Sequence, residues 1–120
     1  MKSALLISTY NWPQALELVL KSAMSQTQLP NEIIIADDGS NDETKLLIEQ
    51  FSQKSHVPIR HVWQEDIGFR KSKILNKAVA QTNAEYIIQV DGDCIMHEKF
   101  IEDHLNEAKK GVYLYGSRVN

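Results

Sequence analysis

Short, continuously apolar segments alternate along the chain with longer segments in which apolar residues recur every three or four positions. The short segments cover residues 4–8, 32–36, 59–63, 86–90 and 112–117. Apolar runs of this length without polar alternation are typical of β-strands that are covered on both faces. A regular order of strand and helix predicts right-handed crossovers, and therefore an α/β fold with a mostly parallel sheet and helices on both of its faces.

Four amphipathic segments between these strands are predicted to be helices. Pro13 suits the first position of the first helix, where proline leaves no N–H group unsatisfied. Ser40 and Glu43 have the spacing of a capping box, so we expect Ser40 or Asn41 to cap the second helix. The residues predicted to face the core are Leu16, Val19, Leu20, Ala23 and Met24, then Thr44, Leu47, Ile48 and Phe51, then Ile74, Leu75, Ala78 and Val79, and finally Phe100, Ile101, Leu105 and Ala108.

Composition excludes several classes of protein. The 120 residues are 42% hydrophobic and 24% charged, which suits one globular domain. The 13 Lys and Arg against 16 Asp and Glu disfavour nucleic acid as a partner. Cys94 is the single cysteine, so there is no internal disulfide and no cysteine-based zinc site. No apolar run approaches the roughly 20 residues of a membrane span. We expect a cytoplasmic location, with the inner face of the membrane as the alternative.

Polar residues follow the predicted strands at 8–11, 37–40 and 91–93. Because ligands bind outside the carboxyl ends of parallel strands, these segments are expected to share one site. In Asp91-Gly92-Asp93, the two carboxylates suit a hard cation, or a cation and a sugar hydroxyl. A carboxylate of Asp37 or Asp38 suits the N–H edge of a base. The alternative for both segments is an ordinary polar turn.

A diphosphate at this site needs an added positive charge, because the sequence has neither a Gly-x-Gly-x-x-Gly nor a Walker-type motif. Arg70, Lys71 and Lys73 are available for this, although a solvated helix face is the usual role of such residues. Trp12 and Trp63 are expected either to stack on a base or sugar or to pack at the core or rim. His104 is predicted to be a packing residue, and Cys94 a small buried hydrophobe.

Taken in order, residues 4–11, 25–27, 35–40 and 90–93 resemble the N-terminal half of family 2 glycosyltransferases, which are inverting enzymes with the GT-A fold. The segment 68–76 is similar to one found in bacterial chondroitin- and capsule-type polymerases and in β-1,4-galactosyltransferases. The resemblance implies transfer of a sugar from a nucleoside-diphosphate sugar, a UDP-sugar by preference, to a saccharide or other hydroxyl acceptor. It also implies dependence on Mn²⁺ or Mg²⁺.

The resemblance further implies roles for individual residues. Metal binding is expected from Asp93 and Asp91, Asp91 also contacting ribose or sugar, and Asp38 is expected to meet the uracil ring. The residues expected to bind the nucleotide are Ser8, Thr9, Tyr10, Asn11, Asp38, Arg70, Lys73, Asp91 and Gly92.

The family's acidic general base lies in a later segment, so the catalytic base is expected beyond Asn120. We therefore expect residues 1–120 to be a donor-binding domain, truncated after the fifth strand and without the acceptor-binding portion. Exposed sheet edges are expected to favour self-association. One alternative is a non-catalytic nucleotide-binding module. Another is a receiver-type signalling domain, which is disfavoured because it needs an acidic pair after the first strand.

Overall fold

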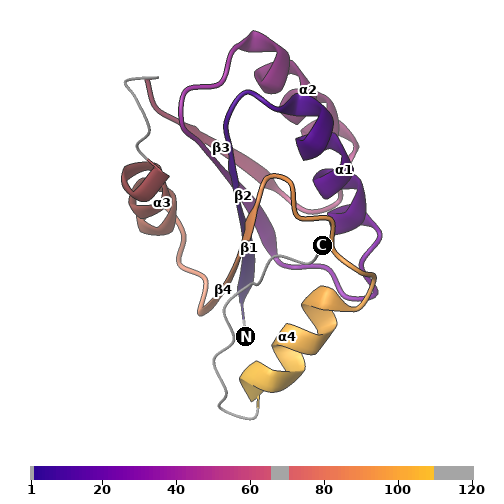
Figure 1. Cartoon of the computed structure of the whole chain (residues 1–120). Helices are drawn as coiled ribbons and strands as arrows, with labels where there is room; N and C mark the ends of the chain where they lie inside the picture. The colour runs from indigo at the N-terminus through magenta and orange to yellow at the C-terminus, as the bar shows by residue number, and fades with distance from the viewer. Residues whose placement is uncertain (1, 66–70, 110–120) are drawn as a thin grey trace.

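The computed structural model describes residues 2–65 and 71–109 (Figure 1). The strands are β1 (Ser3–Thr9), β2 (Glu32–Asp37), β3 (Ile59–Trp63) and β4 (Tyr86–Asp91). The helices are α1 (Pro13–Met24), α2 (Asp42–Lys54), α3 (Lys71–Ala80) and α4 (Phe100–Lys109). The first four predicted strands and all four predicted helices are confirmed. The predicted strand at 112–117 lies outside the described residues.

All strand pairs are parallel, and the strand order is β3-β2-β1-β4. From β1 the chain steps outward to β2 and β3, and it then crosses back to place β4 on the other side of β1. The connections that follow β1 and β3 therefore run in opposite directions across the sheet. In open parallel sheets, such a reversal leaves a crevice at the carboxyl ends of the strands, where ligands bind.

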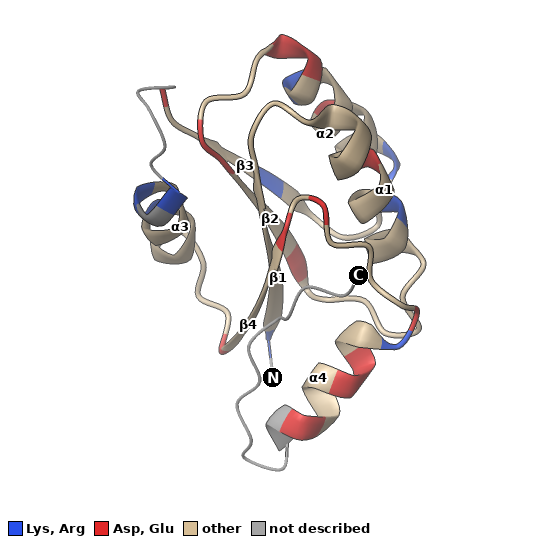
Figure 2. Ribbon diagram, in the orientation of Figure 1, with Lys and Arg blue, Asp and Glu red and all other residues tan. Residues whose placement is uncertain are grey.

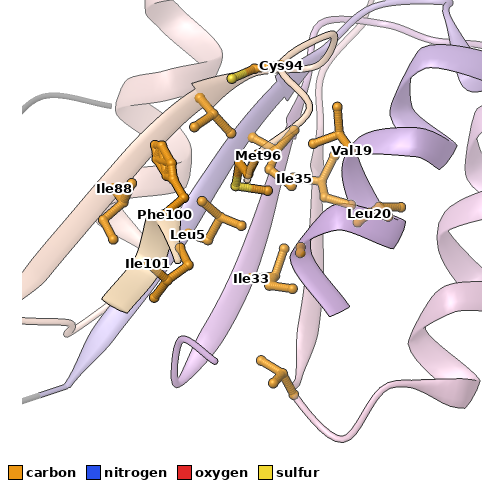
Figure 3. Close-up of a cluster of buried hydrophobic side chains, with 14 of the residues drawn as sticks. Leu5, Val19, Leu20, Ile33, Ile35, Ile88, Cys94, Met96, Phe100 and Ile101 are labelled. Carbon is orange, nitrogen blue, oxygen red and sulfur yellow. The ribbon is translucent and has the colours of Figure 1, made fainter. Parts of the chain in front are cut away.

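Helices cover both faces of the sheet, as predicted (Figure 1). Helices α1, α2 and α4 lie on one face and α3 on the other. The larger core cluster includes Leu5 and Ile33 from the sheet and Leu20 from α1 (Figure 3). The smaller cluster joins Leu6 and Ile34 to α3. Successive strand residues thus enter opposite clusters, which explains why β1 and β2 are buried along their whole length.

One local prediction is wrong, and a second is narrowed to one of its two candidates. Val79 was expected to face the core, but its side chain is 44% exposed, because α3 meets the sheet through Ile74 and Ala78, four residues apart. Ser40 or Asn41 was expected to cap α2; the N-cap residue is Asn41, and it makes no side-chain capping bond. The Ser40 hydroxyl instead accepts a hydrogen bond from the backbone N–H of Asn11, at 2.8 Å.

The prediction that His104 is a packing residue is confirmed. Its side chain is 8% exposed and stacks on Phe100, with the ring centroids 4.7 Å apart. The His104 Nδ1 atom lies 3.3 Å from the hydroxyl of Tyr86 on β4. Burial lowers the pKa of His104 below its ordinary value, and the nearby carboxylate of Asp103 opposes this shift. Cys94 is likewise fully buried, as expected.

Candidate functional site

A cleft of about 340 Å³ lies at the carboxyl edge of the sheet, where the segments after β1, β2 and β4 meet the start of α3. Its volume is within the usual range of small-molecule sites. The lining residues are Ser8, Thr9, Tyr10, Trp12, Ala36, Asp38, Lys71, Ile74, Asp91, Gly92 and Asp93. Three segments that are far apart in the sequence thus meet where the topology predicts a ligand crevice.

Gly92 brings the chain after β4 against the end of β1. A Cβ atom added to Gly92 would lie 2.4 Å from the backbone oxygen of Ser8 and 3.2 Å from the Thr9 side chain. The first distance is shorter than van der Waals contact allows, and a backbone oxygen in a central strand has no room to move. Glycine is therefore required here by close backbone approach. The contact sets the positions of Asp91 and Asp93 relative to β1.

Asp91 is held by two partners at the floor of the cleft. Its Oδ1 atom accepts a hydrogen bond from the Ser8 hydroxyl at 3.2 Å and one from the Lys71 ammonium at 2.6 Å. Ser8 lies directly opposite Asp91 in the sheet register, and Lys71 is the first residue of α3. This ion pair connects the end of β4 to α3, the helix on the sheet face opposite α1.

The turn after β2 is built around the fully buried carboxylate of Asp37. Asp37 Oδ1 accepts the backbone N–H of Ser40 at 2.9 Å, and Asp37 Oδ2 lies 2.8 Å from Nε2 of His61 on β3. Beside it, Asp38 lines the cleft, and its Oδ1 atom accepts a hydrogen bond from the Gln64 side chain at 2.6 Å. Asp37 is therefore structural, whereas Asp38 is one of the residues that line the cleft.

Asn11 joins the segments after β1 and β2. Its backbone N–H donates to the Ser40 hydroxyl, and its side-chain oxygen accepts the backbone N–H of Asn41 at 2.8 Å. These bonds hold Asn11 at a φ of 43°, a left-handed conformation that asparagine tolerates better than most residues. The structure thus gives Asn11 a place beside the cleft, as a link between loops.

The structure brings together most of the residues that the sequence singled out. The predicted residues that line the cleft are Ser8, Thr9, Tyr10, Asp38, Asp91, Gly92 and Asp93. Lys73 is exposed and does not line the cleft, and Arg70 lies outside the described residues. Lys71, which the sequence offered only as one of three basic candidates, contacts Asp91 instead.

Ala36, Ile74 and Trp12 also line the cleft and were not among the predicted site residues. Ala36 and Ile74 belong to the smaller core cluster beneath α3, and their apolar side chains form one wall of the cleft. The sequence pattern indicates only that they are core residues. The sequence did indicate Trp12 as a candidate, since an indole after a strand end can either stack on a ligand or pack at the rim of the fold.

Charge at the cleft is unbalanced in favour of carboxylates. Among its described lining residues, Asp38, Asp91 and Asp93 are acidic and Lys71 is basic. Figure 2 shows acidic residues after β2 and β4 and basic residues on α3. No group of three or more potential metal ligands is found within residues 2–65 and 71–109. One or two carboxylates fit Mg²⁺ or Mn²⁺, which complete their coordination with phosphate oxygens and water.

The model of the family described as "Glycosyl transferase family 2" matches residues 4–120. The chain belongs to this family. Apart from Ser3, the first residue of β1, the match covers every strand and helix described above, and it bears out the resemblance drawn from the sequence.

Two curated relatives illustrate the match within the family. The chain is 31% identical over 108 residues to a cholesterol galactosyltransferase of Borreliella burgdorferi, which covers 90% of this chain and 29% of the relative. It is 32% identical over 108 residues to a chondroitin synthase of Escherichia coli, covering 90% of this chain and 15% of the relative. The chain thus spans less than a third of the length of either relative.

Solved structures support the fold. A crystal structure of Staphylococcus aureus TarS residues 1–349 in complex with UDP-GlcNAc is similar with a TM-score of 0.80 and 24% identity, covering 92% of this chain and 32% of that one. The two chains therefore share the same α/β fold over most of the length of this chain. In the part of the chain that the structure describes, no helix is both long enough and apolar enough to cross a bilayer.

Proposed function

We propose that residues 1–120 form the donor-binding domain of a glycosyltransferase that moves a sugar from a UDP-sugar to a saccharide or other hydroxyl acceptor. The observation that carries this proposal is the arrangement of the cleft. Asp38 lies on its β2 side, Asp91-Gly92-Asp93 lie on its β4 side, and β1 ends between them. The named activities of the two relatives and the UDP-GlcNAc bound in the similar structure support it.

In this proposal the donor lies across the end of β1. Asp38 accepts a hydrogen bond from the ring N–H of uracil, and its contact with Gln64 holds the carboxylate in place. Lys71, at the opposite side of the cleft, pairs with the diphosphate. Asp93 and Asp91 hold Mn²⁺ or Mg²⁺, which fits the acidic excess of the cleft. When bound, the metal acts as a Lewis acid toward the departing diphosphate.

The proposed reaction inverts the anomeric carbon. The acceptor oxygen forms a bond to the anomeric carbon while the bond between that carbon and the phosphate oxygen breaks. UDP leaves, and the proton of the acceptor hydroxyl passes to a general base. From the family resemblance, we place that base and the acceptor site in a segment after residue 120. If the 120-residue chain alone catalyses glycosyl transfer, this assignment of the base is wrong.

Calorimetric titration with UDP, in the presence and absence of Mn²⁺, tests the proposal. We expect saturable binding that strengthens with Mn²⁺, and we expect Asp93→Asn to remove the effect of Mn²⁺. Glu49→Gln, which neutralises an exposed carboxylate on α2, is the matched control and should behave like the unsubstituted chain. If UDP gives no binding heat under either condition, the chain is not a donor-binding domain. Equal affinity with and without Mn²⁺ would contradict the metal assignment alone.

A further inference from the structure

Strand β3 forms one edge of the sheet in the described part of the chain, because β2 is its single neighbour there. The backbone oxygen of Pro58, just before β3, accepts a bond from β2, and the N–H of Gln64, just after β3, donates one to β2. Along a parallel ladder, the backbone groups of successive residues alternate between facing the neighbouring strand and facing away. These bonds and the register therefore turn the backbone groups of Ile59, His61 and Trp63 away from β2.

Nothing within β3 blocks this edge. Sheet edges are usually protected by a bulge, a proline or an exposed lysine. The segment IRHVW contains neither proline nor lysine, and it pairs with β2 without a break in register. The guanidinium of Arg60 donates to the backbone oxygen of Gln81 in the same chain. In the described residues, no hydrogen bond to the outward backbone groups of Ile59, His61 or Trp63 is found. These groups are therefore open to a further strand.

Side chains hold β3 in place and leave apolar surface beside its open edge. His61 Nε2 lies 2.8 Å from Asp37 Oδ2, and the indole N–H of Trp63 donates to the backbone oxygen of Ser40 at 3.0 Å. Ile59 packs against the larger core cluster. Trp63 is nevertheless 52% exposed, although its polar group has a partner. A partner that covers this indole gains free energy from the apolar area that it buries.

We infer that β3 pairs with β3 of a second copy of the chain, antiparallel about a two-fold axis at His61. Directly opposite residues of an antiparallel pair can exchange both of their backbone hydrogen bonds. An axis at His61 sets Ile59 opposite Trp63 of the second copy and engages the outward groups of all three residues. A shift of two residues would set one of the three beyond the end of the partner strand. The number of hydrogen bonds therefore selects this register.

The side-chain pairs of this register are compatible. Trp63 lies opposite the β-branched Ile59, and an aromatic residue opposite a β-branched one stabilises antiparallel strands. The next pair sets Arg60 opposite Val62, so the arginine does not meet its own copy. The same edge thus complements itself, as a two-fold interface requires.

The pairing keeps the two clefts apart. The two copies of His61 meet at the axis, and each ring stays beside the Asp37 carboxylate of its own chain. Antiparallel pairing reverses the strand direction from one copy to the next, so the two clefts open on opposite edges of the joined sheet. The inference therefore goes beyond the proposed function and does not rest on it.

Sedimentation velocity over a range of concentrations tests the inference. We expect a monomer–dimer equilibrium without larger species, because a two-fold pairing occupies the β3 edge of both copies. Trp63→Lys should weaken the dimer by about 2- to 30-fold, since two cross-strand pairs are lost. Leu18→Lys, which places the same charge at a residue of α1 that is 50% exposed, is the matched control and should dimerise like the unsubstituted chain. Urea unfolding checks that both variants are folded.

Disulfide trapping tests the register. A mixture of the Ile59→Cys and Trp63→Cys variants should form a covalent heterodimer under mild oxidation. The reason is that the Cα atoms of opposite residues in a hydrogen-bonded antiparallel pair lie about 5.5 Å apart, within reach of a disulfide. Neither variant alone should form a covalent dimer, since the two copies of either residue lie about 14 Å apart along the strands. Cys94 is fully buried and is common to all samples.

A chain that stays monomeric at every concentration overturns the inference. Association that Trp63→Lys and Leu18→Lys weaken equally also overturns it, because the contact then lies elsewhere. Disulfides that form as readily in either variant alone as in the mixture contradict the register, and with it the two-fold pairing. The titration with UDP decides the proposed function separately, since neither of these measurements depends on a bound nucleotide.

Discussion

At the scale of single residues, the ion pair between Lys71 and Asp91 affects the charge of the cleft more than the stability of the fold. Their side chains are 36% and 40% exposed, so solvent screens the pair and it adds little to the stability of the fold. The ion pair matters for the cleft instead, because it holds the Lys71 ammonium group next to the Asp91 carboxylate. In the proposed donor site, a divalent ion held by Asp91 would compete with the ammonium group, and Lys71 would then be available to the phosphates of the donor.

Lys71 and Lys73 form a matched pair for testing this exchange. We expect Lys71→Ala to weaken binding of UDP in the presence of Mn²⁺ by about tenfold, because one charge-assisted hydrogen bond is lost. Binding of Mn²⁺ alone should not weaken, because a competing cation is removed. Lys73→Ala should change neither affinity, since Lys73 does not line the cleft. Calorimetry with each ligand measures both values. A larger loss for Lys73→Ala would restore the role that the family resemblance implies for it.

The choice between these two lysines illustrates the limit of prediction at this scale. Residues two apart on a helix point about 200° away from each other, so the contact depends on where α3 begins and how it is rotated. Neither quantity follows from the local sequence. The strand-end carboxylates were predictable because a strand end fixes their position at the edge of the sheet. Trp12 was left open between ligand and rim because exposure is a property of the folded chain.

At the scale of elements, the segment between β4 and α4 is held by hydrogen bonds to the end of α1. Gln26, which is buried, donates its amide to the backbone oxygens of His97 and Ser22 at 2.8 and 3.0 Å. Its side-chain oxygen accepts the N–H of Ile101 at 2.9 Å. Two more bonds reach the same segment: the Ser22 hydroxyl accepts the N–H of Met96 at 3.2 Å, and the backbone N–H of Thr27 donates to the Glu98 oxygen at 2.8 Å. Side-chain hydrogen bonds, chiefly those of Gln26, therefore hold the segment that begins with Asp93 against the end of α1.

Replacement of Gln26 tests this connection. Gln26→Leu should lower the free energy of unfolding by about 2–4 kcal/mol, because the buried N–H of Ile101 and the backbone oxygen of His97 lose their partner. Urea unfolding measures the loss, and Gln53→Leu, at an exposed position on α2, should stay within about 0.5 kcal/mol of the unsubstituted chain. In Gln26→Leu protein that is folded at low urea, Mn²⁺-dependent UDP binding should also weaken. Stability equal to that of the control would show that other contacts hold this segment.

The elements themselves were predictable because each apolar run or periodic face is a local property of the sequence. The role of Gln26 was not, since its partner His97 lies 71 residues away. The same reason explains why Asn41, and not Ser40, is the N-cap residue of α2. Its spacing to Glu43 satisfies the local rule for a helix cap, but a bond with Asn11, 29 residues earlier, takes the hydroxyl. Local rules are wrong here where a distant segment offers a competing partner.

At the scale of the whole molecule, three helices share one face of the sheet and one helix covers the other (Figure 1). The sequence predicted helices on both faces but not this division. An amphipathic pattern shows that a helix has an inner side, and it carries no information on which face of the sheet that side covers. The division follows from strand order, since right-handed crossovers in opposite directions place their helices on opposite faces.

Global stability should depend on pH through His104. Its pKa in the folded state is lowered by burial, so the unfolded state binds more protons between that value and about 6.5. Stability from this residue is therefore complete above about pH 6.5, and it is lost as the pH falls toward the lowered pKa of the folded state. Urea unfolding at pH 7.5 and 5.0 measures the loss. It should be smaller in His104→Gln, which has no charge to gain, and an equal loss in both proteins would contradict the assignment.

The pairing of the first strand with the last described one has a consequence for how the site comes into existence. The hydroxyl of Ser8 and the carboxylate of Asp91 are 83 residues apart in sequence, and they meet only when β4 docks against β1. Contacts of such long range close late, because loop-closure entropy opposes them. During synthesis, a ribosome-bound chain that ends before Asp91 therefore cannot complete the site. A ligand that binds in the cleft afterwards should stabilise the whole sheet against unfolding, because separation of β4 from β1 also breaks the site.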